Sequence, residues 1–536
     1  MLTLITLVLT ALAFSQPEGQ PSQALSIPPA AAKSPFGIEY VLVGQNLHNE
    51  KTAQRYKGIG ATWVKFQDCA WQDFEPSPPV DGKHTYAWDK FDNHVRWWQA
   101  NGYQIQVHVK TRNTWAGQPP KGFFSDNRLF LLRFAPFIST PPKEEHWDNW
   151  AAFVEALVER YDGDGIADMP GLKYPILYYE VESEAQHPYW MGTLDEYGKT
   201  LNIFYSKAKQ ACPAVNVLLS GIELGQMAKD NPDDEEVKRR VEAEAAKQPA
   251  VADYIRSVAA FVKGSLAMGD HYDIVEFHAL TDYTAIPGTV KFIRRQLAQS
   301  AYPSKELWAG DATSAPELGT MAAMAGQESR EGEKGRLNLI LKDPKNPEFG
   351  QVNAWFRREQ ASLTVKKIVM SIDSSLTRVF MCCLEDWVGS PWPYHGMVDP
   401  DGTPRPAYRA MQFLTNKLDG YTEEKRLETE DGVCAFRFRF PNRDFYVAWY
   451  ETNEDELDLP TAENPAHALA LRIGETRSGA QGAPKPEQVP AIRAFSLDAV
   501  CQDPKTDGEP RTLDHSAITV EINRYPVFLE LTSPSQ

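Results

Sequence analysis

The stretch YPILYYEVESEAQHPYW, residues 174–190, runs from apolar side chains into three glutamates at alternate positions. An apolar run of this length, bounded by polar residues, is typical of a buried strand. Because successive side chains of a strand point to opposite faces, Glu180, Glu182 and Glu184 would share one face at its carboxyl end. Like charges so close together raise the pKa of at least one of the group. The segment therefore predicts a buried strand that ends in acid groups.

Seven other segments share its length and its content of β-branched and aromatic residues. They cover residues 36–42, 61–67, 103–109, 214–222, 272–279, 305–310 and 377–384. Helical periodicity lies between these strands, at 86–101, 144–161, 193–211, 289–301, within 354–373 and at 405–418. Strands that alternate with helices in this number predict the α/β class and a (β/α)8 TIM barrel over residues 35–420. Two long connections follow strands and are expected over the catalytic face as lid or cleft elements: 226–266, a highly charged helical insertion, and 312–352, which is polar and Gly-rich.

Beyond Gly420 the pattern changes to short alternating strands separated by polar turns. The strand segments are GVCAFRFRF, FYVAWYET, HALALRIG and AITVEINRYPVFLEL. No stretch of helical periodicity interrupts them. Residues 421–536 are therefore expected to form a small C-terminal antiparallel β-sandwich.

The chain begins with an apolar run, MLTLITLVLTALAFSQPEGQ, that contains the small-x-small pattern Ala13-Phe14-Ser15. This pattern predicts a signal peptide over residues 1–15, although the run lacks a Lys or Arg before it. Residues 16–34 are rich in Pro, Ala and Ser and are expected to form a linker. The mature protein would then be secreted, periplasmic or extracellular, without a membrane span; an uncleaved anchor is the alternative.

The composition limits the classes of partner. The 536 residues carry a formal net charge of −17, which argues against a nucleic acid partner because no basic patch is available to displace counterions from phosphates. The 14 tryptophans suit a carbohydrate partner, since an indole offers a flat surface to a sugar ring, although most of them are expected in the core. No cofactor is required by any motif, and the sequence does not indicate an oligomeric state.

The six cysteines have no metal-ligand spacing. Cys382 and Cys383 are adjacent within an apolar strand, where we expect small buried side chains rather than a vicinal disulfide. Cys434 and Cys501 both belong to the C-terminal region and would pair in an exported protein.

Carboxylates and aromatic residues gather where the predicted strands end, and in a barrel these ends meet at one face. The group consists of Glu39, Gln67, Asp68, Trp71, His108, Lys110, Trp115, Glu182, Glu184, Glu223, Glu276, His278, Tyr283, Asp311, Glu385, Asp386 and Trp387. Glycoside hydrolysis needs two carboxylic groups, one protonated and one ionised, on either side of the scissile bond. Crowded acids provide this difference in pKa. The strand ends therefore favour acid–base chemistry on a polyhydroxylated substrate.

Several motifs give residues 36–420 a family resemblance. They are YEVESEA after the fourth strand, KELWAGDATSAP around the seventh, GATWVKFQDCAWQDFEP at the second, VEFHALTDY at the sixth, and YHGMVDPDGTPRPAYRAMQFL after the eighth. Together they resemble the retaining glycoside hydrolases of clan A, in the branch of β-xylosidases and α-iduronidases. The resemblance implies hydrolysis of O-glycosidic bonds in a poly- or oligosaccharide, with Glu184 as acid/base and Asp311 as nucleophile.

The same resemblance implies further roles at the strand ends. The side chains expected to bind substrate are Glu182, Ser183, His108, Trp115, His278, Tyr283, Trp387 and Trp392. Glu180 is expected to point into the barrel and pair with a base such as Lys65 or His108.

Three positions depart from the family pattern. Ser183 stands where the family has Asn, Asp311 where it has Glu, and Lys65 where Arg is usual. Three alternatives follow: a hydrolase that uses Asp311, a hydrolase whose second carboxylate is Glu223, Glu276 or Glu385, or a catalytically inactive barrel that binds carbohydrate.

A short Asp/Gly-rich segment lies before the fourth strand. In YDGDGIADMPG, residues 161–171, Asp162, Asp164 and Asp168 have the spacing of a calcium-binding loop, without its bidentate Glu. The segment suggests a structural calcium ion; a polar turn between a helix and a strand is the alternative.

Overall fold

The computed structural model describes residues 34–42, 48–280, 282–316, 318, 333–386, 394–451, 467–472, 491–511 and 517–532. The predicted signal peptide, the linker up to residue 33, Trp387 and Trp392 lie outside these residues. Within the described part, no helix combines the length and the apolar character needed to cross a bilayer.

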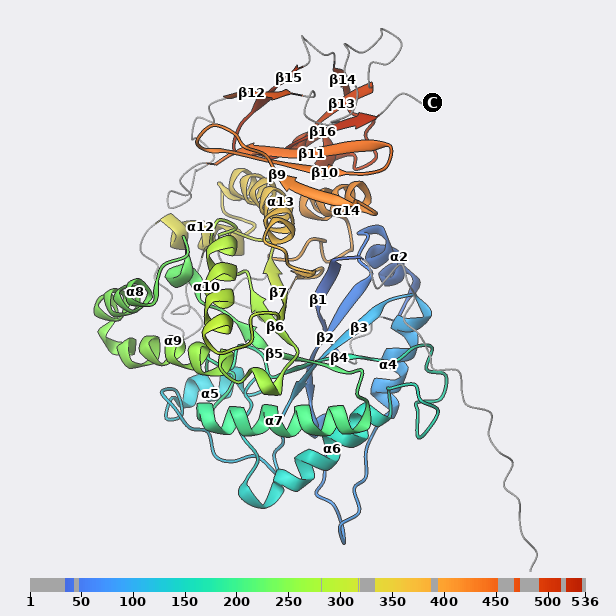
Figure 1. Cartoon of the computed structure of the whole chain (residues 1–536), viewed down its shortest axis with the longest axis vertical. Helices are drawn as coiled ribbons and strands as arrows, with labels where there is room; N and C mark the ends of the chain where they lie inside the picture. Colours follow the sequence, from blue (N-terminus) through green and yellow to red (C-terminus); the bar gives the residue numbers. More distant parts are fainter. Residues whose placement is uncertain are drawn as a thin grey trace, which may run out of the picture.

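Eight parallel strands close into a barrel in sequence order, which confirms the predicted fold (Figure 1). The strands are β1 (Phe36–Leu42), β2 (Trp63–Ala70), β3 (Gln104–Lys110), β4 (Tyr178–Val181), β5 (Asn216–Ile222), β6 (Ile274–His278), β7 (Glu306–Thr313) and β8 (Arg378–Cys382). Each lies within the segment expected from the sequence or extends it by up to three residues. The fourth strand is the shortest, because Ile176 donates its N–H to Tyr161 instead of to a neighbouring strand.

Helices follow the strands and surround the barrel. They are α2 (Glu50–Gly58), α3 (Trp71–Phe74), α4 (Asp89–Ala100), α5 (Arg128–Phe134), α6 (Trp147–Glu159), α7 (Leu194–Ala211), α8 (Asp234–Lys247), α9 (Ala252–Leu266), α10 (Ala285–Gln299), α12 (Glu333–Lys342), α13 (Phe349–Asp373) and α14 (Pro406–Leu418). The sequence sets some of their ends directly. Thr193 and Glu196 form a reciprocal capping box that starts α7.

The inside of the barrel has an apolar floor with a polar layer above it. Trp63, Leu218, Ile274, Trp308 and Phe380 pack together at the floor, and all are buried. Two residues further along their strands, the same inward face carries ionisable side chains, because strand periodicity is two. Lys65 follows Trp63 in this way, and Glu276 follows Ile274. The polar layer is thus placed beneath the carboxyl ends of the strands.

The predicted β-sandwich is also confirmed. One sheet has the order β14-β13-β16-β11-β10-β9 and a second pairs β12 with β15. Their bounds are β9 (Glu423–Arg426), β10 (Val433–Arg439), β11 (Arg443–Tyr450), β12 (His467–Arg472), β13 (Ala491–Ser496), β14 (Glu509–Arg511), β15 (Ala517–Ile522) and β16 (Val527–Thr532), with helix α15 (Leu497–Gln502) after β13. The larger sheet packs on α13 and α14 (Figure 1), where Phe413 meets Phe445, Phe495 and Phe528.

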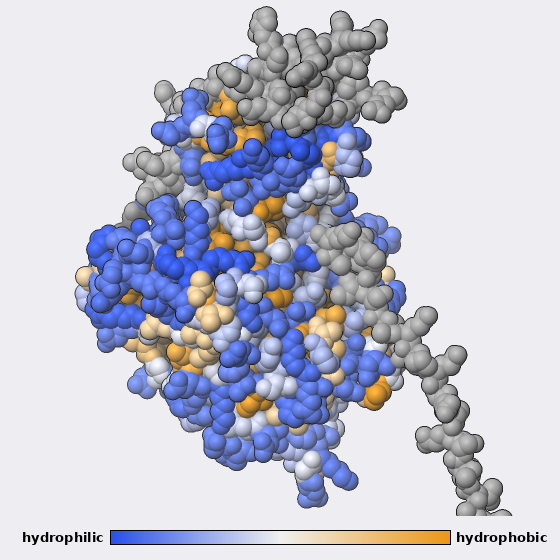
Figure 2. All heavy atoms as spheres, viewed as in Figure 1, coloured by the Kyte–Doolittle hydropathy of each residue, from blue (hydrophilic) through white to orange (hydrophobic). Residues whose placement is uncertain are grey.

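The connection after β5 contains α8 and α9, which pack against each other at the edge of the barrel (Figure 1). Its surface is predominantly hydrophilic (Figure 2), as expected from the many charged residues of α8. The second long connection contains α12, and residues 317 and 319–332 within it lie outside the described part.

Both expectations about cysteine pairing are wrong. Cys382 and Cys383 form a vicinal disulfide at the end of β8. Cys434 and Cys501 are free thiols. The reason is that they face different elements: Cys434 lies beside Arg426 and Glu451, whereas Cys501 contacts the Pro406 carbonyl.

Candidate active site

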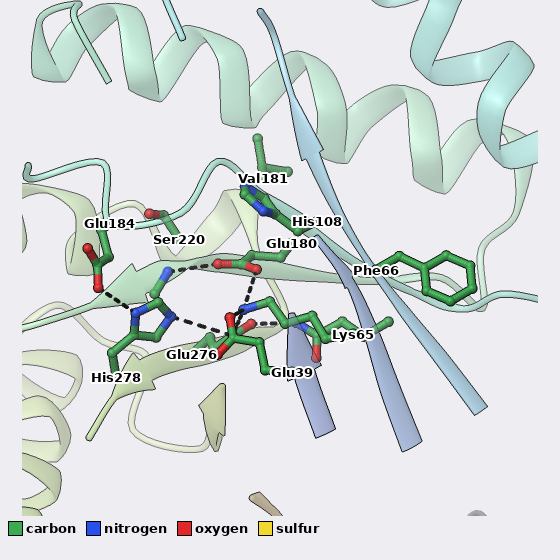
Figure 3. Close-up of polar contacts among 12 residues, drawn as sticks. Glu39, Lys65, Phe66, His108, Glu180, Val181, Glu184, Ser220, Glu276 and His278 are labelled. Carbon is green, nitrogen blue, oxygen red and sulfur yellow. Dashed lines mark hydrogen bonds and ion pairs between the residues drawn. The ribbon is translucent and has the colours of Figure 1, made fainter. Parts of the chain in front are cut away.

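A buried lysine organises the polar layer of the barrel. Lys65 Nζ lies 3.1 Å from Glu39 Oε1 and 2.8 Å from Glu180 Oε2, and it also pairs with Glu276 (Figure 3). All four side chains are at most 1% exposed. Burial lowers the pKa of Lys65, but the three neighbouring carboxyl groups, Glu180 and Glu276 foremost, outweigh it and raise the pKa well above its ordinary value. These four residues are called the Lys65 cluster below, and the expected Lys65–Glu180 pair is part of it.

Neutral donors complete the cluster. Gln106 Nε2 donates to Glu276 Oε2 at 2.6 Å, and the Gly221 amide donates to Glu180 Oε1 at 3.1 Å. Burial, followed by the Glu276 charge, raises the pKa of Glu180 to about 7 against the effect of Lys65. The pKa of Glu276 is lowered, because Lys65 and His278 overcome the opposing effect of burial. The cluster is therefore a nearly neutral, hydrogen-bonded support for the strand ends above it.

Two strand glycines leave the space that these side chains occupy. A Cβ on Gly310 would lie 1.4 Å from Glu276 Oε1, and a Cβ on Gly221 would lie 2.0 Å from His278 Nε2. Glu276 and His278 cannot move aside to relieve these contacts, because both side chains are buried and held by their partners.

Gly310→Ala is therefore expected to lower the free energy of unfolding by about 1–3 kcal/mol, as overpacking does in other buried sites. Urea denaturation measures the change. Gly350→Ala is the matched control, since no atom lies within 4 Å of the added Cβ and Ala suits the first turn of α13 better than Gly. An equal loss in both variants would contradict the steric explanation.

Glu184 and His278 form an ion pair above the cluster. His278 Nδ1 lies 2.7 Å from Glu184 Oε1, and Nε2 points toward Glu276 Oε1 at 3.8 Å (Figure 3). Burial disfavours a charged imidazole, but the hydrogen bond to Glu184 and the nearby Glu276 carboxylate raise the pKa of His278 well above its ordinary value. Burial likewise opposes a charged Glu184, yet the His278 hydrogen bond lowers the pKa of this carboxyl. The free protein thus holds Glu184 as a carboxylate and His278 as an imidazolium.

This result corrects the expected effect of the three alternate glutamates. Their mutual repulsion does not set their charge states, because each one meets different partners. Glu180 belongs to the Lys65 cluster. Glu182 turns to Thr111, whose amide and hydroxyl donate to Oε1 at 2.7 and 2.8 Å. Only Glu184 pairs with His278.

The backbone after β4 is strained on both sides of Ser183. Glu182 has a φ of 60° and Glu184 a φ of 48°, in the left-handed region that costs non-glycine residues about 1–2 kcal/mol each. Tertiary hydrogen bonds hold the turn: the Glu182 amide donates to the Val109 carbonyl at 2.9 Å, and the Ala185 amide donates to Ser220 Oγ at 2.9 Å. The turn redirects Glu184 away from the strand and toward His278.

Asp311, on β7, lies next to Glu39 and close to His278. It is the register partner of His278 on the neighbouring strand. Oxygens of Glu39 and Asp311, together with Cys382 Sγ, lie within 4.8 Å of one another. Burial raises the pKa of Asp311, and the Glu184 charge adds to this effect while His278 opposes it. Glu184 and Asp311 therefore reach the same rim and share His278 as a charged neighbour.

Other predicted substrate-binding residues lie in structural positions. Glu182 is 1% exposed and bound to Thr111. Ser183 is 9% exposed in the strained turn. His108 is fully buried beside Glu180 on β3, where Nδ1 accepts the Asp68 amide at 3.3 Å; burial, followed by the Lys110 charge, lowers the pKa of His108 well below its ordinary value.

Two aromatic residues lie against the core instead of at the rim. Trp115 donates its indole N–H to the Glu75 carbonyl at 3.0 Å and packs edge-on against Trp71. Tyr283 is fully buried and packs edge-on against Trp449 of β11. The structure does not bring Tyr283 to Glu184 and Asp311.

Two rim carboxylates considered as alternatives have other partners. Glu223 Oε2 lies 3.3 Å from His187 Nε2. Glu385 lies near Tyr56 and Arg55, at 3.5 and 3.4 Å. The third alternative, Glu276, is held in the Lys65 cluster.

Sequence reasoning missed the pair His187 and Tyr254. His187 Nδ1 lies 2.7 Å from the Tyr254 hydroxyl, so the inserted helix α9 reaches the loop that carries Glu184. Burial disfavours a charged His187, but the hydrogen bond to Glu223 and the Glu184 charge raise its pKa. His187 could have been noticed from its position three residues after Glu184, whereas nothing in the sequence marks Tyr254.

The predicted calcium-binding residues lie together. Carboxylate oxygens of Asp162, Asp164 and Asp168 come within 4.8 Å of one another. Asp168 accepts the amides of Gly163 and Gly165 at 2.9 and 2.7 Å. These contacts are also those of a polar turn, so calcium stays a prediction.

Comparison with known proteins identifies the fold. No family model and no curated protein matches the chain. Three solved structures share its architecture at a TM-score of 0.53: a family 39 glycoside hydrolase from Bacteroides cellulosilyticus WH2 (13% identity, 94% of this chain and 82% of that chain), a monomeric β-xylosidase from Caulobacter crescentus CB15 (15%, 96% and 99%), and a GH39 enzyme from Xanthomonas axonopodis pv. citri (12%, 96% and 96%). The chain has the fold of these hydrolases. At such identities the likeness concerns architecture, so the chemistry has to be argued from the residues.

Proposed function

We propose that the protein hydrolyses O-glycosidic bonds of a poly- or oligosaccharide, with Glu184 and Asp311 as its two carboxylic groups. The observation that carries this proposal is the Glu184–His278 ion pair at 2.7 Å, on strand ends next to Asp311. The pair places a protonated imidazole, His278, and a carboxylate, Glu184, at the same rim of the barrel. The glycoside hydrolase fold of the structural neighbours supports the substrate class, and export from the cell is part of the proposal.

In the proposed first step, the proton on His278 Nδ1 passes to Glu184, which transfers it to the departing glycosidic oxygen. The Asp311 carboxylate attacks the anomeric carbon as that bond breaks, giving a glycosyl ester and a free alcohol. In the second step, water attacks the same carbon, Glu184 accepts the proton of this water, and the ester to Asp311 breaks. The sugar leaves as a hemiacetal, Asp311 is again a carboxylate, and Glu184 returns its proton to His278 Nδ1, which restores the starting state.

A panel of aryl glycosides of neutral sugars tests the proposal. We expect hydrolysis of at least one member. Asp311→Asn is expected to lower kcat on the order of 10³-fold or more, because it removes the nucleophile, which acts together with Glu184 in the same step. Release of the phenol measures the rate. An Asp311→Asn variant as active as the natural protein would contradict the assignment, and the same measurement on Glu223→Gln and Glu385→Gln would then locate the second carboxylate.

The second candidate function is carbohydrate binding without cleavage. It is favoured by Asp311, whose side chain is one methylene shorter than the Glu of the family pattern. It is also favoured by Ser183, a buried residue directly before Glu184 that stands where the family has Asn. Glycan-array binding by a protein that hydrolyses no member of the panel would support this candidate, particularly if Glu184→Gln and Asp311→Asn were equally inert.

A further inference from the structure

Glu39 is a buried carboxyl group with one oxygen that lacks a donor. Its side chain is 1% exposed at the inward face of β1. Oε1 lies 3.1 Å from Lys65 Nζ, while Oε2 has no hydrogen-bond partner among the described residues. A buried acceptor without a donor destabilises the folded state. The cost disappears if Oε2 carries a proton and donates it to a neighbouring acceptor.

Asp311 is the acceptor within reach. Its carboxylate lies in the group with Glu39 and Cys382 whose polar atoms are within 4.8 Å of one another. The donor found for Asp311 in the described part of the chain is the Thr313 hydroxyl, at a long 3.4 Å. Two buried carboxyl groups at such a separation disfavour simultaneous ionisation, because each negative charge opposes the other. A single proton shared between Glu39 and Asp311 would give the Glu39 oxygen a hydrogen-bond partner and Asp311 a donor.

The charged groups around Glu39 decide which partner holds this proton. They are Lys65 on β2, Glu276 and His278 on β6, and Asp311 on β7, whereas Cys382 on β8 is in a disulfide and does not titrate. Burial, followed by the Asp311 charge, raises the pKa of Glu39 well above its ordinary value. Burial also raises the pKa of Asp311, but the His278 charge and the neighbouring Glu39 carboxyl group oppose that effect. The proton therefore belongs to Glu39.

We propose that Glu39 is a positioning residue that accepts from Lys65 through Oε1 and donates a proton through Oε2 to Asp311. This inference rests on the proposed role of Asp311. It gives Asp311 a hydrogen-bond donor that fixes the direction of its short side chain and keeps it ionised for attack. Lys65 in turn fixes which oxygen of Glu39 carries the proton.

Glu39→Gln and Glu39→Leu test the proposal together. Glutamine reproduces a protonated glutamate, because its carbonyl can accept from Lys65 and its amide can donate to Asp311. Leucine has a similar volume and no donor. We expect the glutamine variant to retain at least about tenfold more kcat/KM than the leucine variant. A glutamine variant as impaired as the leucine variant would overturn the proposal.

The pH profile of kcat/KM separates positioning from a merely structural role. Without a donor, Asp311 ionises less readily, so the acid limb is expected to move upward by about one pH unit in Glu39→Leu. Glu39→Gln, which keeps a donor, is expected to leave that limb in place. Equal acid limbs in both variants would contradict the hydrogen bond to Asp311.

A stability measurement tests the proton without relying on activity. A raised carboxyl pKa means that the folded state binds more protons than the unfolded state, so this contribution to stability falls as pH rises from the unfolded pKa of Glu, about 4.3, toward the folded value. Glutamine has no such titration. The folding equilibrium constant of Glu39→Gln relative to the natural protein is expected to rise with pH, by up to about tenfold per unit. A ratio independent of pH would overturn the proposal, even if no glycoside were hydrolysed.

Discussion

Replacing Glu184 with glutamine is expected to lower kcat/KM by about 10²–10⁴-fold on a glycoside with a poor leaving group. Glutamine cannot carry the proton that His278 supplies, so the glycosidic oxygen would have to leave as an alkoxide. A nitrophenolate needs much less help in leaving, so the loss on a nitrophenyl glycoside is expected to be clearly smaller. Initial rates on an alkyl and a nitrophenyl glycoside of the same sugar measure this difference.

The matched control for this prediction is Glu223→Gln. Glu223 lies at the same rim but pairs with His187 instead of His278, and its replacement is expected to change the two rates by a similar, small factor. If Glu223→Gln showed the leaving-group dependence and Glu184→Gln did not, the proton donor would be Glu223.

The largest expected effect on stability is that of Lys65→Met. Methionine fills a similar volume but leaves Glu39, Glu180 and Glu276 without their common cation in a fully buried site. Breaking a buried ion pair by removing one partner costs about 3–5 kcal/mol. We expect a loss of that order in the free energy of unfolding, measured by urea denaturation at neutral pH.

The pH dependence of Lys65→Met gives a second measurement. Without Lys65, the pKa values of all three carboxyl groups rise in the folded state, so the variant loses stability as the pH rises above the unfolded Glu value. The deficit relative to the natural protein is therefore expected to be smaller at pH 5 than at pH 8. Lys263→Met is the control, because the partly exposed pair of Lys263 with Asp234 is worth about 1 kcal/mol or less. A Lys65→Met variant no less stable than this control would contradict the structural role of the cluster.

The positions of the strands could be predicted from the sequence because their signals are local, and so could those of the helices α4, α6, α7, α10, α13 and α14. The apolar runs of β1 to β8 and the helical periodicity between them can each be recognised within a short segment of the sequence. Alternation also placed Glu180 inside the barrel, which led to the correct expectation of its pair with Lys65. The left-handed residues Glu182 and Glu184 had no such signal, because tertiary hydrogen bonds, and not glycine, hold them in that conformation.

Candidate site residues were harder to sort, since a position after a strand does not say where a side chain points. Tyr283 follows β6 as expected but packs beneath the β-sandwich. Trp115 follows β3 but lies against Trp71. His187 and Tyr254 meet only because α9 folds back over the loop after β4.

The sequence by itself determined the barrel, the sandwich and the carboxylates available at the strand ends, because each of these depends on residue type and spacing along one segment. Only the tertiary structure decided which acid carries a proton and which is ionised. A pKa depends on burial and on charges contributed by other strands. For Glu184 and Glu39 those charges are His278 and Asp311, which lie 94 and 272 residues away in the sequence.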